Sequence, residues 1–252
     1  MEPQKLTTKQ YNRSDQIPTV TFATTCYEKD WRPILLDPEY LRVKQIENHR
    51  FPFAEKILII NNVANLEEVR RAAEKHVEQG TLTQIVIAEE LALKILPFFQ
   101  LSRDDFANDW VYYNALAPFA AIYACKTDFL LYMTGDASLD KPVSWIERAT
   151  RRMDKKPDYK VANLIWNENK REARRESSQR EWFFYVAERG FSDQMFLVRR
   201  ADFQQPIYRE IHPDSHHFPR GDVFEKRVFS AMIHRSWKRI TYRWGSYWHR
   251  NF

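Results

Sequence analysis

Four short apolar segments, separated by segments of helical pattern, are the feature of this sequence that most restricts its fold. They are rich in aliphatic and β-branched residues and lie at residues 19–25, 56–60, 83–88 and 129–133. The clearest helix lies between the second and third, where Asn65 and Glu68 have capping-box spacing and Gly80 stands at the expected stop. This alternation predicts a parallel sheet with helices on both faces.

The second half of the chain mixes strand-like and irregular segments. We expect strands at residues 159–166, 181–188 and 194–199, and a helix at residues 222–239. No internal repeat or low-complexity linker separates the two halves. The sequence therefore predicts a single α/β domain with a Rossmann-like, mixed but mainly parallel sheet flanked by helices.

Glycine is scarce, with 5 residues in a chain of 252, and no two of them lie close together. A G-x-G-x-x-G fingerprint and a P-loop both need clustered glycines, because their backbone N–H groups must approach phosphate closely. The sequence excludes both kinds of phosphate cradle. A bound nucleotide would need a metal ion or basic side chains to hold its phosphates.

Charge and cysteine content bear on location more than on function. The net charge of +5 suits a polyanion, a phosphorylated ligand or a membrane surface, and does not choose among them. Cys26 and Cys125 lie far apart, which indicates reduced thiols. The first 16 residues lack the apolar core of a signal peptide, and the apolar stretches are too short to span a bilayer. We expect a cytoplasmic protein that could still bind a membrane peripherally.

The segment FLLYMTGDASLD, residues 129–140, carries the strongest functional signal. An apolar strand ends there in an acidic turn, and ligands of parallel α/β sheets bind at the carboxyl ends of strands. Asp136 in this position would hold Mg²⁺ or Mn²⁺, which could bridge to a diphosphate. Capping of the following turn is the alternative explanation for this aspartate.

The order of these parts resembles that of GT-A-type nucleotide-sugar glycosyltransferases, most closely the inverting family 2, from about residue 18 to about residue 239. In that family an apolar strand ends in a D-x-D motif, whose last aspartate binds the divalent cation on the sugar-nucleotide diphosphate. Asp136 matches this aspartate, and Thr134 replaces the first one. The resemblance implies a GT-A-like fold, with a nucleotide-binding half over about residues 18–140. Residues from about 141 to 252 would form the acceptor-binding half and a C-terminal cover.

Other segments match the same family pattern. PTVTFATTCYE resembles the first strand and its nucleotide-contacting turn, which implies donor contacts from Thr24 and Tyr27. KILIINNV resembles the second strand and implies a contact from Asn61. MFLVRRADF resembles the acceptor-side strand, and Arg199 would add positive charge at the diphosphate. With Thr134, these residues would form the donor site.

The resemblance also implies a base and a further metal ligand. Residues 221–225, GDVFE, resemble the head of the helix that supplies the general base in inverting members, so Asp222 and Glu225 are the two candidates. A capping pair in the first turn of a helix explains both residues equally well. Several GT-A-type enzymes return a C-terminal histidine to the metal, and His249 matches it. An ordinary histidine in a basic tail is the alternative.

Residues 234–252 interleave aromatic and cationic side chains. Such a segment could bind nucleic acid, lie at a membrane interface, or cover the active site and pack into the core, and we favour the last. No recognised nucleic-acid motif is present. We therefore expect a metal-dependent glycosyltransferase, inverting by resemblance, that uses a UDP- or GDP-sugar and a glycan or lipid-linked acceptor. There are two alternatives: a catalytically inactive sugar- or nucleotide-binding protein of the same fold, and a nucleic-acid-binding protein that uses the basic aromatic tail.

Overall fold

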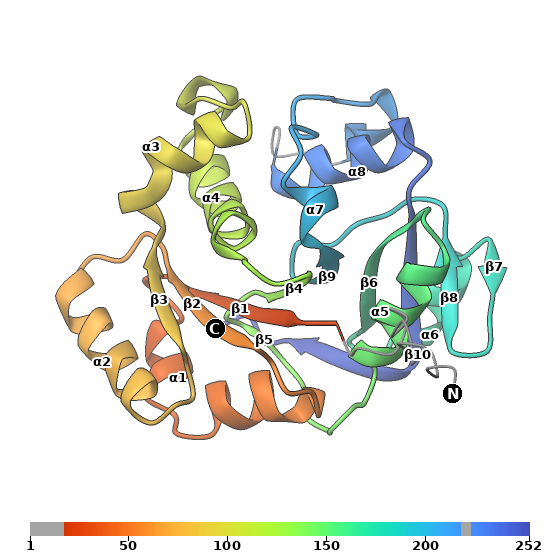
Figure 1. The fold of residues 1–252 in the computed structure, drawn as a ribbon. Coiled ribbons are helices and arrows are strands. Elements are labelled where there is room, and N and C mark those ends of the chain that lie inside the picture. Colours follow the sequence, from red (N-terminus) through yellow and green to blue (C-terminus); the bar gives the residue numbers. More distant parts are fainter. Residues whose placement is uncertain (1–17, 218–222) are drawn as a thin grey trace, which may run out of the picture.

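A sheet of ten strands runs through the computed structural model, which describes residues 18–217 and 223–252 (Figure 1). Its first half consists of β1 (Val20–Cys26), β2 (Glu55–Ile60), β3 (Gln84–Ile87) and β4 (Phe129–Met133). These strands are parallel neighbours in the order β3-β2-β1-β4. The parallel half expected from the apolar segments is therefore confirmed.

The second half of the sheet changes direction. It consists of β5 (Ala137–Ser138), β6 (Tyr159–Trp166), β7 (Gln179–Arg180), β8 (Phe184–Ala187), β9 (Met195–Arg199) and β10 (Lys238–His249). The order continues from β4 as β9-β6-β10-β8-β7, and β5 pairs with β10. Because β9 is antiparallel to both β4 and β6, whereas β10 is parallel to β6, the ends of β4, β6 and β10 share one edge with the start of β9.

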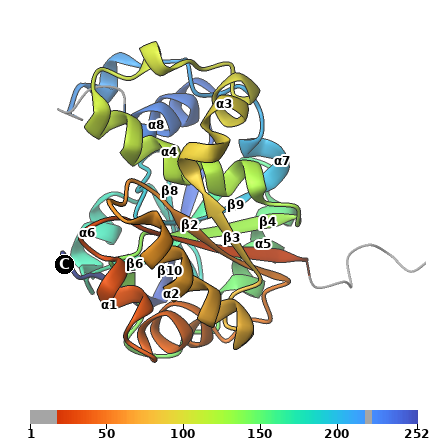
Figure 2. The ribbon, with the colours of Figure 1, turned by 90° about the vertical axis from the view of Figure 1, so that its left-hand side faces the viewer.

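Helices cover both faces of this sheet (Figures 1 and 2). One face carries α1 (Trp31–Leu35), a π-helical turn (Tyr40–Ile46) with a 3-10 turn (Glu47–His49), α2 (Leu66–Glu78) and α5 (Ile146–Lys155). The other face carries α3 (Ala88–Phe98), α4 (Asp109–Ala124), α7 (Arg200–Phe203) and α8 (Phe224–His234). The short α6 (Lys170–Arg175) contacts β6.

Two apolar clusters form the core, one on each face. Side chains alternate along a strand, so Phe22 of β1 packs in the cluster under α1, α2 and α5, whereas its neighbour Ala23 packs in the cluster under α3, α4 and α8. Both clusters extend from the parallel half into β6 and β9. Each of the two clusters therefore contains residues from both halves of the chain.

The C-terminal region differs from the sequence expectation. The helix expected to reach residue 239 ends at His234, and β10 begins at Lys238 after Ser236 adopts a left-handed φ of 52°. The segment that follows is rich in β-branched and aromatic residues, and both of its long edges pair with neighbouring strands. The aromatic basic segment is thus an interior strand of the sheet.

Gly135, in the turn after β4, has no room for a side chain. An added Cβ would lie 2.2 Å from the carbonyl oxygen of Thr25 and 2.3 Å from Cδ1 of Ile34. The turn therefore rests directly on the end of β1 and on α1.

We expect Gly135→Ala to lower the free energy of unfolding by about 3 kcal/mol, because backbone atoms must move to admit the methyl group. The matched variant Gly80→Ala meets nothing within 4 Å but keeps a φ of +71°. It should cost only about 1 kcal/mol. Urea denaturation of the two variants measures the difference, and equal losses would contradict this packing.

Candidate functional site

Two residues expected as metal ligands lie side by side at the carboxyl edge of the sheet. Asp136 stands in the turn after β4, and His249 is the last residue of β10. Their Oδ2 and Nε2 atoms are 2.8 Å apart. The short ladder between β5 and β10 holds them there, because it pairs Ala137 with His249. Residues from distant parts of the chain therefore form one polar pair.

The side chain of Gln45 holds the turn that carries Asp136. The amide nitrogen of Gln45, on the π-helical turn, donates to the carbonyl oxygens of Thr134 at 3.1 Å and of Gly135 and Ala137 at 2.9 Å each. The backbone N–H of Arg250 donates to the carbonyl oxygen of Asp136 at 2.8 Å. These bonds hold the backbone on both sides of the carboxylate.

Asp136 and His249 stabilise each other's charged forms. Partial burial raises the pKa of Asp136, but hydrogen bonds from His249 and Thr134 outweigh it and bring this pKa below its usual range. The hydrogen bond to Asp136 raises the pKa of His249 above its usual value, against partial burial, which lowers it. The two groups form an ion pair when both are charged.

Three further carboxylates lie around this pair. They are Asp30 after β1, Asp193 before β9 and Glu225 in the first turn of α8. Burial is the main cause that raises the pKa of Asp30 to about 8, of Asp193 to about 6 and of Glu225 to about 9. Asp193 adds to the raised pKa of Glu225, and Asp136 to that of Asp30. Raised pKa values of this kind keep Asp30 and Glu225 mostly protonated, and therefore neutral, at neutral pH.

A pocket of about 230 Å³ lies beside the pair. Glu225, Arg239, Gln194 and Tyr247 are among the residues that line it. Gln194 connects the pocket to the pair, because its side-chain nitrogen is 3.4 Å from Nδ1 of His249. An acid, a guanidinium and amide groups thus face one cavity, which suits a polar ligand rich in hydroxyl groups.

The chemistry of the pair fits Mn²⁺ or Mg²⁺. Imidazole and carboxylate are both ligands that manganese accepts. Within residues 18–217 and 223–252 no group of three or more His, Cys, Asp and Glu side chains could hold a metal.

The other expected donor-site residues divide into two groups. Thr134 lies at the edge with Asp136. Desolvation raises the pKa of Tyr27, and Asp30 and Asp136 lie close enough to raise it further. Thr24, by contrast, is fully buried in β1. Asn61 is also buried, and its amide nitrogen donates to the carbonyl oxygen of Tyr113 at 2.8 Å. In this structure the side chains of Thr24 and Asn61 are buried beneath the edge, and their expected contact with the donor stays a prediction.

Arg199 does not lie at this edge, so its expected place beside the diphosphate is wrong. Because β9 is antiparallel to β4, Arg199 pairs with Phe129 at the opposite end of the sheet. Its guanidinium there lies 2.5 Å from Oδ1 of Asp154. Of the two expected bases, Glu225 lines the pocket, and Asp222 lies outside the described residues.

Sequence reasoning missed Gln45, Asp30 and Asp193. Asp193 stands two residues before the apolar run MFLVR, so an antiparallel assignment of that strand would have placed it at the edge. Asp30 follows the first strand by only a few residues, which is a weak signal of the same kind. Gln45 has no local signal, because its role depends on a turn that is distant in sequence.

No protein-family model matches the sequence, and a search of curated proteins finds no match. Solved structures do resemble this fold. The mannosyltransferase PcManGT from Pyrobaculum calidifontis, in complex with GDP-Man and Mn²⁺, superposes with a TM-score of 0.56 and 13% sequence identity over 94% of this chain. GalNAc-T7 with UDP, GalNAc and Mn²⁺ gives a TM-score of 0.57 and 10% identity over 93% of this chain.

These similarities show that the chain has the GT-A fold expected from its sequence. The match spans 58% of the mannosyltransferase and 44% of GalNAc-T7, so this chain corresponds to about half of each.

Among the described residues, no helix has the length and apolar character needed to cross a bilayer.

We expect the pKa of His249 in metal-free protein to lie above 6.5, because the Asp136 carboxylate stabilises the imidazolium. The pair should stabilise the fold most between the ordinary pKa values of 3.8 and 6.5. This contribution is lost as pH falls through the lowered pKa of Asp136, or rises through the raised pKa of His249. Histidine NMR titration measures the shift.

Asp136→Asn is the control for this titration. It removes the negative charge and leaves the partial burial of His249, so the pKa of the imidazole should fall to or below 6.5. An unchanged titration in this variant would contradict the assignment of the shift to Asp136.

Proposed function

We propose that this protein is a glycosyltransferase that moves a sugar from a nucleoside-diphosphate sugar, a UDP- or GDP-sugar, to a hydroxyl group of a glycan or lipid-linked acceptor. The observation that carries the proposal is the Asp136–His249 pair at the carboxyl edge of a GT-A fold. The Mn²⁺ and nucleotide ligands of the two similar structures support it. A lipid-linked acceptor would bring the protein to a membrane surface.

Each side chain of the site has a role in this proposal. Asp136 and His249 would hold Mn²⁺ or Mg²⁺, which neutralises charge on the departing diphosphate when bound. Tyr27 and Thr134 would contact the donor. Glu225 would take the proton of the acceptor hydroxyl, since it faces the pocket and a carboxyl of raised pKa is a stronger base once ionised. If the acceptor hydroxyl displaces the diphosphate directly, the configuration of the anomeric carbon would be inverted.

A non-catalytic role in sugar or nucleotide binding is the second candidate. It is favoured by the raised pKa of Glu225, since a carboxyl with a pKa of about 9 is mostly protonated at neutral pH. Thr134 also stands where the family motif has its first aspartate. Donor binding without transfer distinguishes this role from the first.

We expect wild-type protein to bind a UDP- or GDP-sugar in the presence of Mn²⁺, and Asp136→Asn to weaken this binding by roughly 100-fold. The carboxylate supplies a charged metal ligand that an amide replaces poorly. Isothermal titration calorimetry with and without Mn²⁺ measures the effect.

The control for donor binding is Asp154→Asn, which removes a carboxylate at the opposite edge of the sheet. It should leave donor affinity unchanged. If no nucleotide sugar binds wild-type protein, or if Asp136→Asn binds as tightly as wild type, the proposed donor site is wrong.

Glu225→Gln should leave donor affinity within about twofold and lower transfer to an acceptor by roughly 1,000-fold, as expected for loss of a general base. An acceptor array of glycans and lipid-linked sugars, with product detection by mass spectrometry, measures transfer. Unaffected transfer would exclude Glu225 as the base, and Asp193→Asn and Asp222→Asn would then be tested. Donor binding by wild type with no transfer to any acceptor would favour the non-catalytic role.

A further inference from the structure

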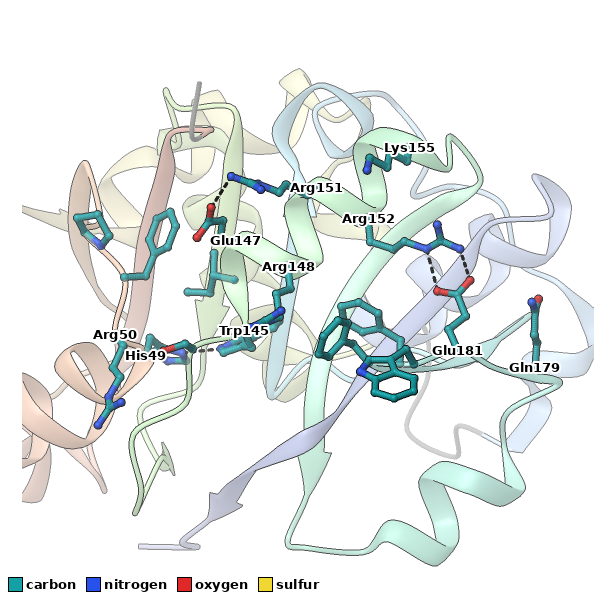
Figure 3. A pocket seen from close by; sticks show the side chains of 17 residues that line it. His49, Arg50, Trp145, Glu147, Arg148, Arg151, Arg152, Lys155, Gln179 and Glu181 are labelled. Atoms are coloured by element: carbon teal, nitrogen blue, oxygen red, sulfur yellow. Dashed lines mark hydrogen bonds and ion pairs between the residues drawn. The ribbon is translucent and has the colours of Figure 1, made fainter. Parts of the chain in front are cut away.

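A larger pocket, of about 810 Å³, lies beside α5, and Figure 3 shows the side chains that line it. Its walls come from α5, from the segment before β2 and from the hairpin of β7 and β8. We call it the α5 pocket. Because α5 packs in one core cluster and α8 in the other, the sheet separates this pocket from the candidate site.

Positive charge predominates in the α5 pocket. Its cations are Arg50, Arg148, Arg151, Arg152 and Lys155. The two acids of the pocket neutralise only two of them: Glu147 pairs with Arg151 at 2.6 Å, and Glu181 accepts from Nε of Arg152 at 2.8 Å. These pairs are drawn in Figure 3.

The other three cations have no carboxylate partner in the described part of the chain. The guanidinium of Arg148 lies 4.4 Å from the centre of the Phe183 ring, while Arg50 and Lys155 line the walls. Three uncompensated charges around one cavity attract an anionic ligand, and guanidinium groups match carboxylate and phosphate geometry.

An exposed indole stands beside these cations. Trp182 is 79% exposed, yet the backbone that carries it is held in place. Nη1 of Arg243 donates to the carbonyl oxygens of Glu181 at 2.9 Å and of Trp182 at 2.8 Å. The indole face is thus presented to solvent from a fixed turn, where a flat apolar surface of a ligand can pack against it.

One wall of the α5 pocket is preformed. Nε1 of Trp145 donates to Nδ1 of His49 at 3.0 Å, and both side chains are buried. Burial lowers the pKa of His49 to about 3, so this imidazole is neutral and accepts the bond. Arg50 follows directly, with a left-handed φ of 48°. The position of this cation therefore depends on a rigid, apolar support.

We propose that the α5 pocket binds an anionic saccharide, a short sugar chain that carries carboxylate or phosphate groups. The uncompensated cations would bind the anionic groups, and aromatic faces such as that of Trp182 would pack against the C–H faces of sugar rings. The cavity lies within the usual size range of ligand sites. Among the described residues that line the cavity, Ser144 carries an uncharged hydroxyl group and Gln179 an uncharged amide group. Two such side chains are too few to recognise a nucleotide base by hydrogen bonds to its edges. The proposal does not depend on glycosyl transfer at Asp136.

The test uses the full chain and two trisaccharides of similar size, trigalacturonic acid and neutral maltotriose. Calorimetry should show that the acidic sugar binds at least about tenfold more tightly, and that its affinity falls as salt is added. Trp182→Ala and the double variant Arg148→Gln/Lys155→Gln should each weaken acidic-sugar binding by about tenfold or more. Trisaccharide 1-phosphates tested in parallel distinguish phosphate from carboxylate as the preferred group.

Matched variants outside the pocket provide the controls. Trp244→Ala removes another indole that is 61% exposed, and Arg171→Gln removes an exposed cation of α6. Both should bind the acidic sugar as wild type does, and all variants should keep the wild-type Tm. The proposal would be overturned if inorganic phosphate binds as tightly as the acidic sugars, or if a nucleotide binds more tightly and Trp182→Ala weakens that binding. Equal binding by all variants, or no binding of either class of acidic sugar, would also overturn it. None of these outcomes depends on donor binding at Asp136.

Discussion

The antiparallel pairing of β4 with β9 determines most of what lies at the candidate site. Its register places Met133 opposite Met195, so the residues before β9 stand beside the turn that carries Asp136. The same pairing sends Arg199 to the far edge of the sheet. Because β6 is antiparallel to β9 and β10 is parallel to β6, β10 runs in the direction of β4 and ends at the same edge. The relative directions of these four strands therefore bring His249 to the edge where Asp136 lies.

Local sequence patterns were sufficient for the parallel half of the fold and for one residue of the site. Apolar runs identify β1 to β4, and an acidic turn after the fourth identifies Asp136. His249 was expected only through the family resemblance, because nothing near it in the sequence indicates a partner. Its place beside Asp136 is a property of the whole sheet.

The features that the sequence pattern did not predict share a physical cause. The hydrophobic period of a strand does not show whether it runs parallel or antiparallel to its neighbours. The sequence pattern alone therefore could not show at which edge of the sheet Arg199 lies. The burial of the Thr24 side chain depends on the helices that cover both faces of β1. The helix expected to reach residue 239 has a pattern that fits a helix locally, but pairing with β6 and β8 favours a strand from Lys238. In this last case tertiary contacts overrode the local preference.

The interior position of β10 has a consequence for how the protein is made. In the order β6-β10-β8-β7, the hairpin of β7 and β8 joins the sheet only through β10, although it precedes β10 in the chain. As the chain leaves the ribosome, β7 and β8 must therefore wait, without their final neighbour, until β10 has been synthesised. The pairing of β10 then joins the hairpin to the sheet and brings an imidazole to Asp136. The Asp136–His249 pair therefore cannot form before β10 has been synthesised.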